Sequence, residues 1–252
     1  MGQEAALLLV RRCRLVTACV ALALGSCQGE PAGTVDPRHY DAFFLWPGMR
    51  PPDLPGGPKV VYLLAGELRG SDANHFVPLR AVPHVPSAEV WLTVRAERLD
   101  WGEGVYSQVL GELAQWQLAG NHVAGLQVDF DAATRGLDGY AVFLADLRRR
   151  LPPRYRLSVT GLMDWSAQGD PGALAKLNGI LDEVVIQTYQ GRHTIPGYQR
   201  YMESLTRLAV PHRIGLVEGG EWQAPAGLAK DRLFRGYVVF LLNRPPQRSK
   251  MR

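Results

Sequence analysis

Two aspartates close an apolar stretch in the middle of the chain. Asp129 and Asp131 stand two residues apart at the end of residues 123–131, a segment otherwise made mainly of Val, Ala, Gly, Leu and Phe. Side chains two residues apart in an extended strand point to the same face, so we expect both carboxyl groups to face one cavity. Carboxyl groups that share an apolar site push their pKa values apart, and one then donates a proton while the other stays charged. We expect Asp131 to hold the proton and Asp129 to stay ionised.

A structural role for the same pair is the alternative. Two carboxylates at the end of an apolar strand lose hydration and repel each other, so they need a nearby arginine or several backbone donors. The strand itself carries no such partner, although a neighbouring strand is able to supply one. Asp131 is also well placed to cap the loop that follows it.

Polar and aromatic side chains at the ends of other apolar segments are further candidates for binding a substrate. These candidates are Glu67, Asp164, Trp165 and Glu218. A carboxyl group accepts hydrogen bonds from hydroxyl groups, and a tryptophan ring stacks on the face of a sugar. Each candidate also has a structural interpretation, because aspartates cap helices and tryptophans pack in cores.

The sequence lacks the residue patterns that are typical of metal sites and of serine hydrolases. The six histidines show no HxH or HExxH spacing, and the three cysteines all fall within the first 27 residues. The chain also lacks the GxSxG pattern that presents a nucleophilic serine. We therefore expect no metal and no cofactor.

The apolar segments that position these residues are short, rich in β-branched residues and mostly continuous. Continuous runs of this kind are typical of parallel strands that are buried on both faces. We expect strands at residues 42–46, 59–66, 89–96, 123–131, 156–162, 183–189, 213–219 and 237–243.

Helical patterns alternate with the later strands, at residues 105–118, 137–151, 171–181 and 198–208. Alternation of this kind predicts βαβ units and a parallel sheet, either open or closed into a barrel. Eight expected strands and the absence of a Gly-rich phosphate loop favour a closed (β/α)₈ barrel. Proline-rich connections replace the first two helices, and a final helix is not evident. The barrel is therefore expected to be irregular in its first two βα units and to lack a clear last helix.

The segment AGLQVDFD resembles the strand 4 signature DxxDxDxE of family 18 glycoside hydrolases, the chitinase-like barrels. Its acidic positions fall on Ala124, Gln127, Asp129 and Asp131. The resemblance implies that Asp131, in the place of the family's glutamate, is the general acid, and that Asp129 stabilises the nucleophile supplied by the substrate. Because Asp131 is shorter than glutamate and two acidic positions are lost, that mechanism does not transfer intact.

Two further segments extend this resemblance to substrate-binding residues. VVIQTYQ resembles the family's MTYD strand, which makes Tyr189 a catalytic candidate and Gln190 and Gln187 binding candidates. GYVVF resembles the segment of the family's floor tryptophan, with Phe240 in that place.

A closer resemblance covers most of residues 41–243. QVDFDAATRGLDGYAVFLADLRRRLP, LSVTGLMDW and LDEVVIQTYQG are similar to successive motifs of a bacterial family known as domain of unknown function 3142. The chain is identified as a member of that family, which implies a barrel at the cell envelope and supplies no activity.

The two ends of the chain differ from its body in composition. RRCR, the apolar run LVTACVALALG and LGSC at residues 24–27 resemble a bacterial lipoprotein signal, which predicts a signal peptide over 1–26 and lipidation of Cys27. We expect a tether at 27–40, the barrel at 41–243 and a basic tail at 244–252. A secretory signal or an uncleaved anchor is the alternative. We therefore expect the protein to be lipid-anchored at the bacterial cell envelope, with the periplasm or the exterior as the alternative location.

The positive charge of the chain does not indicate nucleic-acid binding. The formal net charge of +4 is concentrated at the two ends, away from any aromatic or Gly-rich motif. Three hypotheses follow for the function: a glycoside-hydrolase-like enzyme acting on a polysaccharide, a non-catalytic carbohydrate-binding barrel, and an envelope scaffold for partner proteins.

Overall fold

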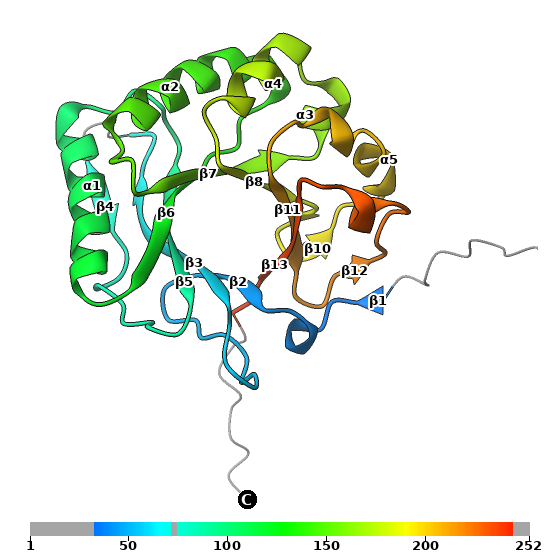
Figure 1. Ribbon diagram of the computed structural model, residues 1–252, viewed down its shortest axis with the longest axis horizontal. Coiled ribbons are helices and arrows are strands. Elements are labelled where there is room, and N and C mark those ends of the chain that lie inside the picture. The colour runs from blue at the N-terminus through cyan, green and yellow to red at the C-terminus, as the bar shows by residue number, and fades with distance from the viewer. Residues whose placement is uncertain (1–32, 72–74, 244–252) are drawn as a thin grey trace, which may run out of the picture.

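A closed barrel of parallel strands forms the centre of the computed structural model, which describes residues 33–71 and 75–243 (Figure 1). Its wall consists of β2 (Ala42–Leu45), β3 (Val60–Leu68), β5 (Glu89–Ala96), β6 (His122–Asp129), β7 (Arg156–Leu162), β8 (Glu183–Gln187), β11 (His212–Val217) and β13 (Phe234–Phe240). Neighbours along the chain pair in parallel, and β13 pairs with β2 to close the ring. The predicted (β/α)₈ TIM-type barrel is therefore confirmed.

Helices cover the part of the wall that runs from β5 to β8. α1 (Glu103–Leu118), α2 (Leu137–Arg150) and α4 (Pro171–Asn178) lie outside the barrel (Figure 1). Each buries one apolar stripe against the strands; in α2 the stripe consists of Leu137, Tyr140, Ala141, Phe143, Leu144 and Leu147. The large core thus lies between helices and strands, and a smaller one fills the barrel around the stacked rings of Tyr62 and Trp91.

Two predicted helices differ in extent from the observed ones. α4 ends at Asn178, because Gly179 follows as its C-cap and glycine is a poor helix former. The helix expected at 198–208 is two short pieces, α5 (Gln199–Met202) and η3 (Leu205–Arg207). The apolar spacing was correct, because Met202, Leu205 and Leu208 are all buried.

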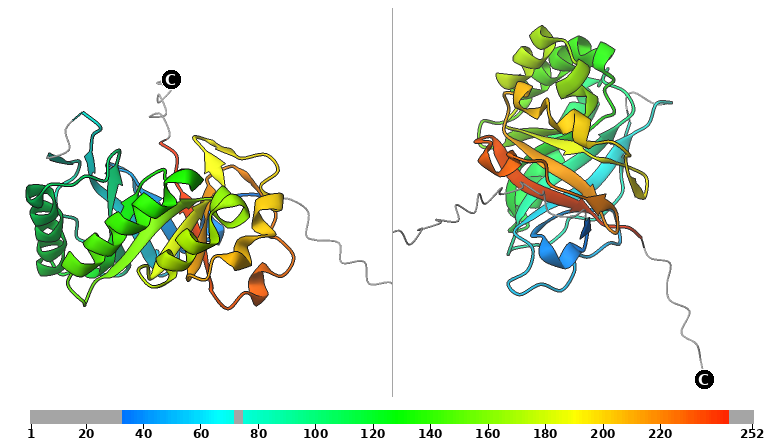
Figure 2. Two further views of the ribbon diagram at one scale, coloured as in Figure 1. Left: turned by 90° about the horizontal axis from the view of Figure 1, so that it is seen from above. Right: turned by 90° about the vertical axis from the view of Figure 1, so that its right-hand side faces the viewer.

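The barrel is irregular in its first two βα units and after its last strand, as the sequence predicts. The connection from β2 to β3 has no helix, and the next one contains only β4 (Phe76–Pro78), an antiparallel addition to the sheet. Within the described residues no helix follows β13. The outer face of β11 and β13 has no long helix in front of it (Figure 2, right).

Short segments cover that side instead. β1 (Gly33–Thr34) pairs with β12 (Glu221–Trp222), and η1 (Pro37–His39) and η4 (Leu228–Lys230) lie nearby in the chain. Val35 is buried and exchanges backbone hydrogen bonds with Gly219 and Gly220. The part of the predicted tether at residues 33–35 thus pairs with residues 219–222 beside the barrel.

The remaining elements are short: α3 (Asp164–Gln168), η2 (Thr134–Gly136), and the hairpin of β9 (Tyr189–Gln190) and β10 (His193–Thr194). Among the helices of the described residues, none combines the length and hydropathy needed to cross a membrane. The predicted signal peptide, the lipidation site Cys27 and the basic tail lie outside the described residues.

Candidate active site

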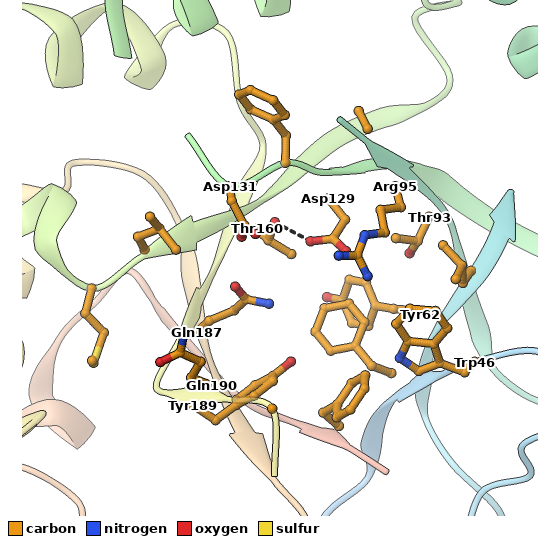
Figure 3. A pocket seen from close by; sticks show the side chains of 18 of the residues that line it. Trp46, Tyr62, Thr93, Arg95, Asp129, Asp131, Thr160, Gln187, Tyr189 and Gln190 are labelled. Carbon is orange, nitrogen blue, oxygen red and sulfur yellow. Dashed lines mark hydrogen bonds between the residues drawn. The ribbon is translucent and has the colours of Figure 1, made fainter. Parts of the chain in front are cut away.

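A cavity of about 980 Å³ opens at the carboxyl ends of the barrel strands (Figure 3). Its lining includes residues from β2, β3, β5, β6, β7, β8 and β13. The carboxyl ends of parallel strands form the functional face of barrels of this type, because the loops that vary between proteins start there. The cavity is therefore the candidate site.

Asp129 and Asp131 both line the cavity, as the sequence predicts (Figure 3). β6 ends at Asp129, two residues before the expected end, so Asp131 lies in the loop that follows. Asp129 is half-buried, whereas Asp131 is exposed. The two carboxyl groups thus share one cavity at different depths.

The surroundings of Asp129 set the direction of its pKa. Burial raises the pKa of this carboxyl, and the charge of Asp131 adds to the rise. Two groups oppose it: Thr160 Oγ1 donates a hydrogen bond to Oδ1 at 2.8 Å, and the positive charge of Arg95 favours the ionised form. The net shift is upward, so the surroundings of Asp129 favour its protonated form, and the expectation that Asp129 is the ionised member of the pair stays a prediction.

Trp46 and Tyr189 lie across the cavity from the two aspartates (Figure 3), and Phe240 also lines the cavity. Phe240 stacks on Tyr189 with ring centroids 5.4 Å apart, and Trp46 meets Phe240 edge-on at 6.1 Å. Burial and then the charge of Asp129 raise the pKa of Tyr189 far above neutral pH, so its hydroxyl keeps its proton. We call Trp46, Phe240 and Tyr189 the aromatic wall.

Three other predicted binding residues also line the cavity: Gln187, Gln190 and Asp164. Gln187 is the last residue of β8 and lies two residues before Tyr189. Asp164 begins α3, and its Oδ1 is buried without a hydrogen-bond partner. Burial raises the pKa of this carboxyl.

Gln127 was predicted to bind substrate, but it lies inside the barrel and is fully buried. Its Oε1 accepts a hydrogen bond from Thr93 Oγ1, and its Nε2 donates one to Ser158 Oγ, both at 3.2 Å. The side chain points to the same face as Asp129 but one layer deeper. Its amide is satisfied by neighbouring strands and does not line the cavity.

Trp165, Glu67 and Glu218 are also absent from the cavity lining. Trp165 is fully buried, and its Nε1 donates to the carbonyl of Ala132 at 2.8 Å. Glu67 pairs with Arg69 at 2.6 Å, and Glu218 accepts a hydrogen bond from the backbone of Leu242. These three residues have structural partners where the sequence indicated ligand contacts.

Arg95 and Thr160 are cavity residues that the sequence analysis missed. Arg95 is paired in register with Asp129 across β5 and β6, and its guanidinium carbon lies 5.8 Å from the centroid of the Trp46 ring. A charged residue near the end of an apolar strand was the signal that identified Asp129. Applied to residues 89–96, the same signal identifies Arg95.

A metal site is not evident in this cavity. Within residues 33–71 and 75–243, no group of three or more His, Cys, Asp or Glu side chains is arranged to hold a metal ion. The described side chains of the cavity offer proton transfer, charge stabilisation and stacking.

Residues 88–207 match the model of a family described as domain of unknown function (DUF3142). The matched segment runs from β5 to η3 and carries Asp129, Asp131 and Tyr189. The resemblance to this family that the sequence indicates is thus confirmed over that segment. No curated protein matches the chain.

Several solved structures are similar in fold to part of this chain. The chitinase domain of the spore coat protein CotE from Clostridium difficile is 13% identical, with a TM-score of 0.47 over 70% of this chain and 64% of that one. The spore cortex-lytic enzyme SleL from Bacillus cereus is 18% identical, with a TM-score of 0.46 over 71% of this chain and 50% of that one. A putative lyase/mutase from Burkholderia cenocepacia is 12% identical, with a TM-score of 0.41 over 79% and 76%. This chain spans less than two thirds of the first two structures.

Proposed function

We propose that the cavity binds a polysaccharide chain and hydrolyses a glycosidic bond, using Asp129 and Asp131 as its carboxyl pair. The observation that supports this proposal is that both aspartates line the cavity and that Trp46 and Tyr189 of the aromatic wall lie across from them. Aromatic rings stack on the apolar faces of sugars, and two carboxyl groups supply the proton and the negative charge that glycoside cleavage needs.

The environment of each carboxyl favours a division of roles opposite to the one expected from the sequence. Burial raises the pKa of Asp129, so this group is better suited to hold a proton for the leaving oxygen. Thr160 occupies its Oδ1, and no described residue hydrogen-bonds Oδ2. Asp131, exposed at the rim, then provides the charge that stabilises the positive sugar ring in the transition state.

Non-catalytic carbohydrate binding is the second candidate. Asp131 is exposed and has a shorter side chain than the glutamate of the family 18 signature, and Gln127 is held by hydrogen bonds inside the barrel. A displacement of about 1 Å of a catalytic group costs on the order of 100-fold in rate. A barrel whose carboxyl groups are displaced in this way retains the aromatic wall and binds sugars without cleaving them.

The location is proposed from the sequence alone. The order of basic residues, apolar run and LGSC supports cleavage before Cys27 and a lipid anchor at the bacterial cell envelope, with the periplasm or exterior as the alternative. Mass spectrometry of the mature protein and of Cys27→Ser tests this. A lipid-modified start at Cys27 that is lost in the variant supports the anchor, and an unmodified start elsewhere contradicts it.

The function is tested by offering the purified full chain an array of polysaccharides while recording binding and the release of reducing ends. Asp129→Asn and Asp131→Asn are each expected to lower turnover by at least about 100-fold, the usual contribution of a positioned acid or base. Asp138→Asn is the matched control, because Asp138 is an exposed carboxylate on α2 that pairs with Lys176.

Three outcomes separate the hypotheses. Turnover that both site variants abolish supports the hydrolase. Binding without turnover in the wild type supports the carbohydrate-binding barrel. The absence of both, with a folded protein, contradicts the carbohydrate site and favours the scaffold.

A further inference from the structure

We propose that Arg95 binds a carboxylate carried by a sugar of the bound glycan, and that this contact makes the cavity prefer carboxylated chains over neutral ones. The inference rests on the proposed carbohydrate site. It narrows the substrate class to glycans whose sugars carry a carboxyl group, either on the ring as in uronic acids or on a lactyl ether.

Arg95 supplies the positive charge of the cavity. Among the described residues that line the cavity, no other Lys, Arg or His side chain occurs. Arg95 is exposed, whereas Val94 and Ala96 on either side of it in β5 are buried. Because alternate residues of a strand share a face, Arg95 lies on the inner face of the barrel with Thr93, one layer nearer the mouth.

The guanidinium of Arg95 is held by packing and not by an acceptor. Its carbon lies 5.8 Å from the centroid of the Trp46 ring, and within residues 33–71 and 75–243 the side chain makes no hydrogen bond or ion pair. Asp129 is its partner in strand register and lies beside it (Figure 3), but Oδ1 of Asp129 accepts its hydrogen bond from Thr160. The N–H donors of Arg95 are therefore available to a ligand.

A carboxylate matches these donors in geometry and in charge. A guanidinium is a planar fork, which binds the two oxygens of a carboxylate through parallel hydrogen bonds. The contact with Trp46 restricts the side chain before the ligand arrives, so less freedom is lost on binding. A neutral hydroxyl group accepts one of these hydrogen bonds and supplies no charge.

The proposed role of Asp129 leaves the charge of Arg95 unmatched. Burial raises the pKa of Asp129, and a proton on this carboxyl removes the negative charge next to Arg95. A carboxylate of the ligand then replaces that charge. It also cancels the positive charge that favours ionised Asp129, so it keeps the proposed acid protonated.

The other carboxyl groups of the cavity oppose an anionic ligand, so the preference depends on a close pair with Arg95. Glu97 and Asp131 are exposed, and solvent and salt weaken their repulsion. Burial raises the pKa of Asp164, which favours its neutral form. The opposing charges are thus weak where they are exposed, whereas a bidentate pair acts at hydrogen-bond distance.

The aromatic wall is continuous with Arg95. Trp46 contacts Arg95 and also lies 6.1 Å from Phe240 between ring centroids, and Phe240 stacks on Tyr189. A sugar that stacks on this wall therefore has Arg95 next to its edge, where the substituents of the ring project.

The test compares two matched pairs of tetramers by isothermal titration calorimetry with the full chain. The first pair is galacturonic acid and its methyl ester, and the second is alternating N-acetylglucosamine and N-acetylmuramic acid against N-acetylglucosamine alone. At about pH 6 a carboxyl group of ordinary pKa is ionised. The carboxylated tetramer is expected to bind about tenfold more tightly than its neutral partner, the scale of a hydrogen bond to a charged group. The pair that shows the preference identifies where the sugar carries its carboxylate.

Variants of Arg95 assign the preference to this side chain. Arg95→Gln should bind both members of a pair equally, and Arg95→Lys, which keeps the charge without the planar fork, should retain only part of the preference. Arg149→Gln is the matched control and should keep the full preference, because Arg149 is an exposed arginine on α2 that pairs with Asp146.

A second measurement needs no variant. Carbon-13 NMR should find a higher pKa for Asp129 with the carboxylated tetramer bound than with the neutral one, because the bound carboxylate lies next to Asp129. Equal binding within both pairs, a preference that survives Arg95→Gln, or the same Asp129 titration with either ligand overturns the inference while leaving the carbohydrate site intact. If no tetramer binds, both the inference and the proposed function fail.

Discussion

Thr160 on β7 donates a hydrogen bond of 2.8 Å to Oδ1 of Asp129 on the neighbouring strand β6. This contact connects a buried hydroxyl to the carboxyl that we propose as the acid, and it favours the ionised form of that carboxyl. The hydroxyl therefore limits how far burial raises the pKa of Asp129.

Thr160→Val should raise the pKa of Asp129 further, because it removes the hydrogen bond while keeping the shape of the side chain. Carbon-13 NMR titration of the Asp129 carboxyl measures the change, and Thr160→Ser, which keeps a hydroxyl, is the control. A titration that is the same in Thr160→Val and in the wild type contradicts this role.

Asp129→Asn should stabilise the fold at neutral pH. Because the folded-state pKa of Asp129 lies above its unfolded value, the native state binds the proton more tightly, and the stability contributed by this group falls as pH rises through that interval. Asparagine has no charge to desolvate, so the variant is expected to melt a few degrees above the wild type at about pH 7. At about pH 3, where the aspartate is largely protonated in both states, the difference should vanish. Thermal unfolding at several pH values checks this, and a variant that is less stable at neutral pH refutes it.

Trp165→Phe should lower stability while leaving ligand binding intact. The substitution leaves the carbonyl of Ala132 without its buried donor, at a cost of about 1–3 kcal/mol, and the smaller ring adds a void. Trp46→Phe in the aromatic wall is the matched comparison, and it should weaken sugar binding with little effect on the free energy of unfolding. Urea unfolding and calorimetry on both variants distinguish a core tryptophan from a cavity tryptophan. A loss of affinity in folded Trp165→Phe would place Trp165 in the site after all.

Glu183→Gln should destabilise the barrel from within. Glu183 lies at the start of β8, pairs with Arg213 at 2.9 Å and accepts a hydrogen bond from the Tyr62 hydroxyl at 2.6 Å. Removing its charge leaves the partly buried guanidinium of Arg213 without this ion pair, at a cost below the about 3–5 kcal/mol of a fully buried pair. The double variant Glu183→Gln/Arg213→Met should recover part of that loss in urea unfolding. If the double variant is no more stable than the single one, the ion pair is not the cause.

The sequence predicts the strand that carries the carboxyl pair but not the depth of its residues. Alternation along β6 places Gln127 and Asp129 on the same face, as the structure confirms. Whether such a residue lies in the cavity or in the interior depends on side chains from β5 and β7. For Gln127 these are Thr93 and Ser158, which no local pattern connects to it.

Trp165 shows a second limit of local patterns. Asp164 and Trp165 follow the same strand, and both were assigned to the site. α3 begins at Asp164, and consecutive residues in a helix point about 100° apart. Asp164 therefore reaches the cavity, while Trp165 turns into the core beside Tyr140, with ring centroids 6.0 Å apart.

The pairing of β13 with β2 has a consequence for the order in which the barrel is built. Phe240 pairs with Phe44, so the contact that closes the ring joins one of the first described strands to the last. Contacts between such distant residues form slowly, and during synthesis β2 and β11 remain open edges until β13 has emerged. Phe240 also connects Trp46 to Tyr189 in the aromatic wall. A nascent chain that stops short of Phe240 therefore has no closed ring and no complete stacking surface, and its unpaired strands are free to pair with other chains.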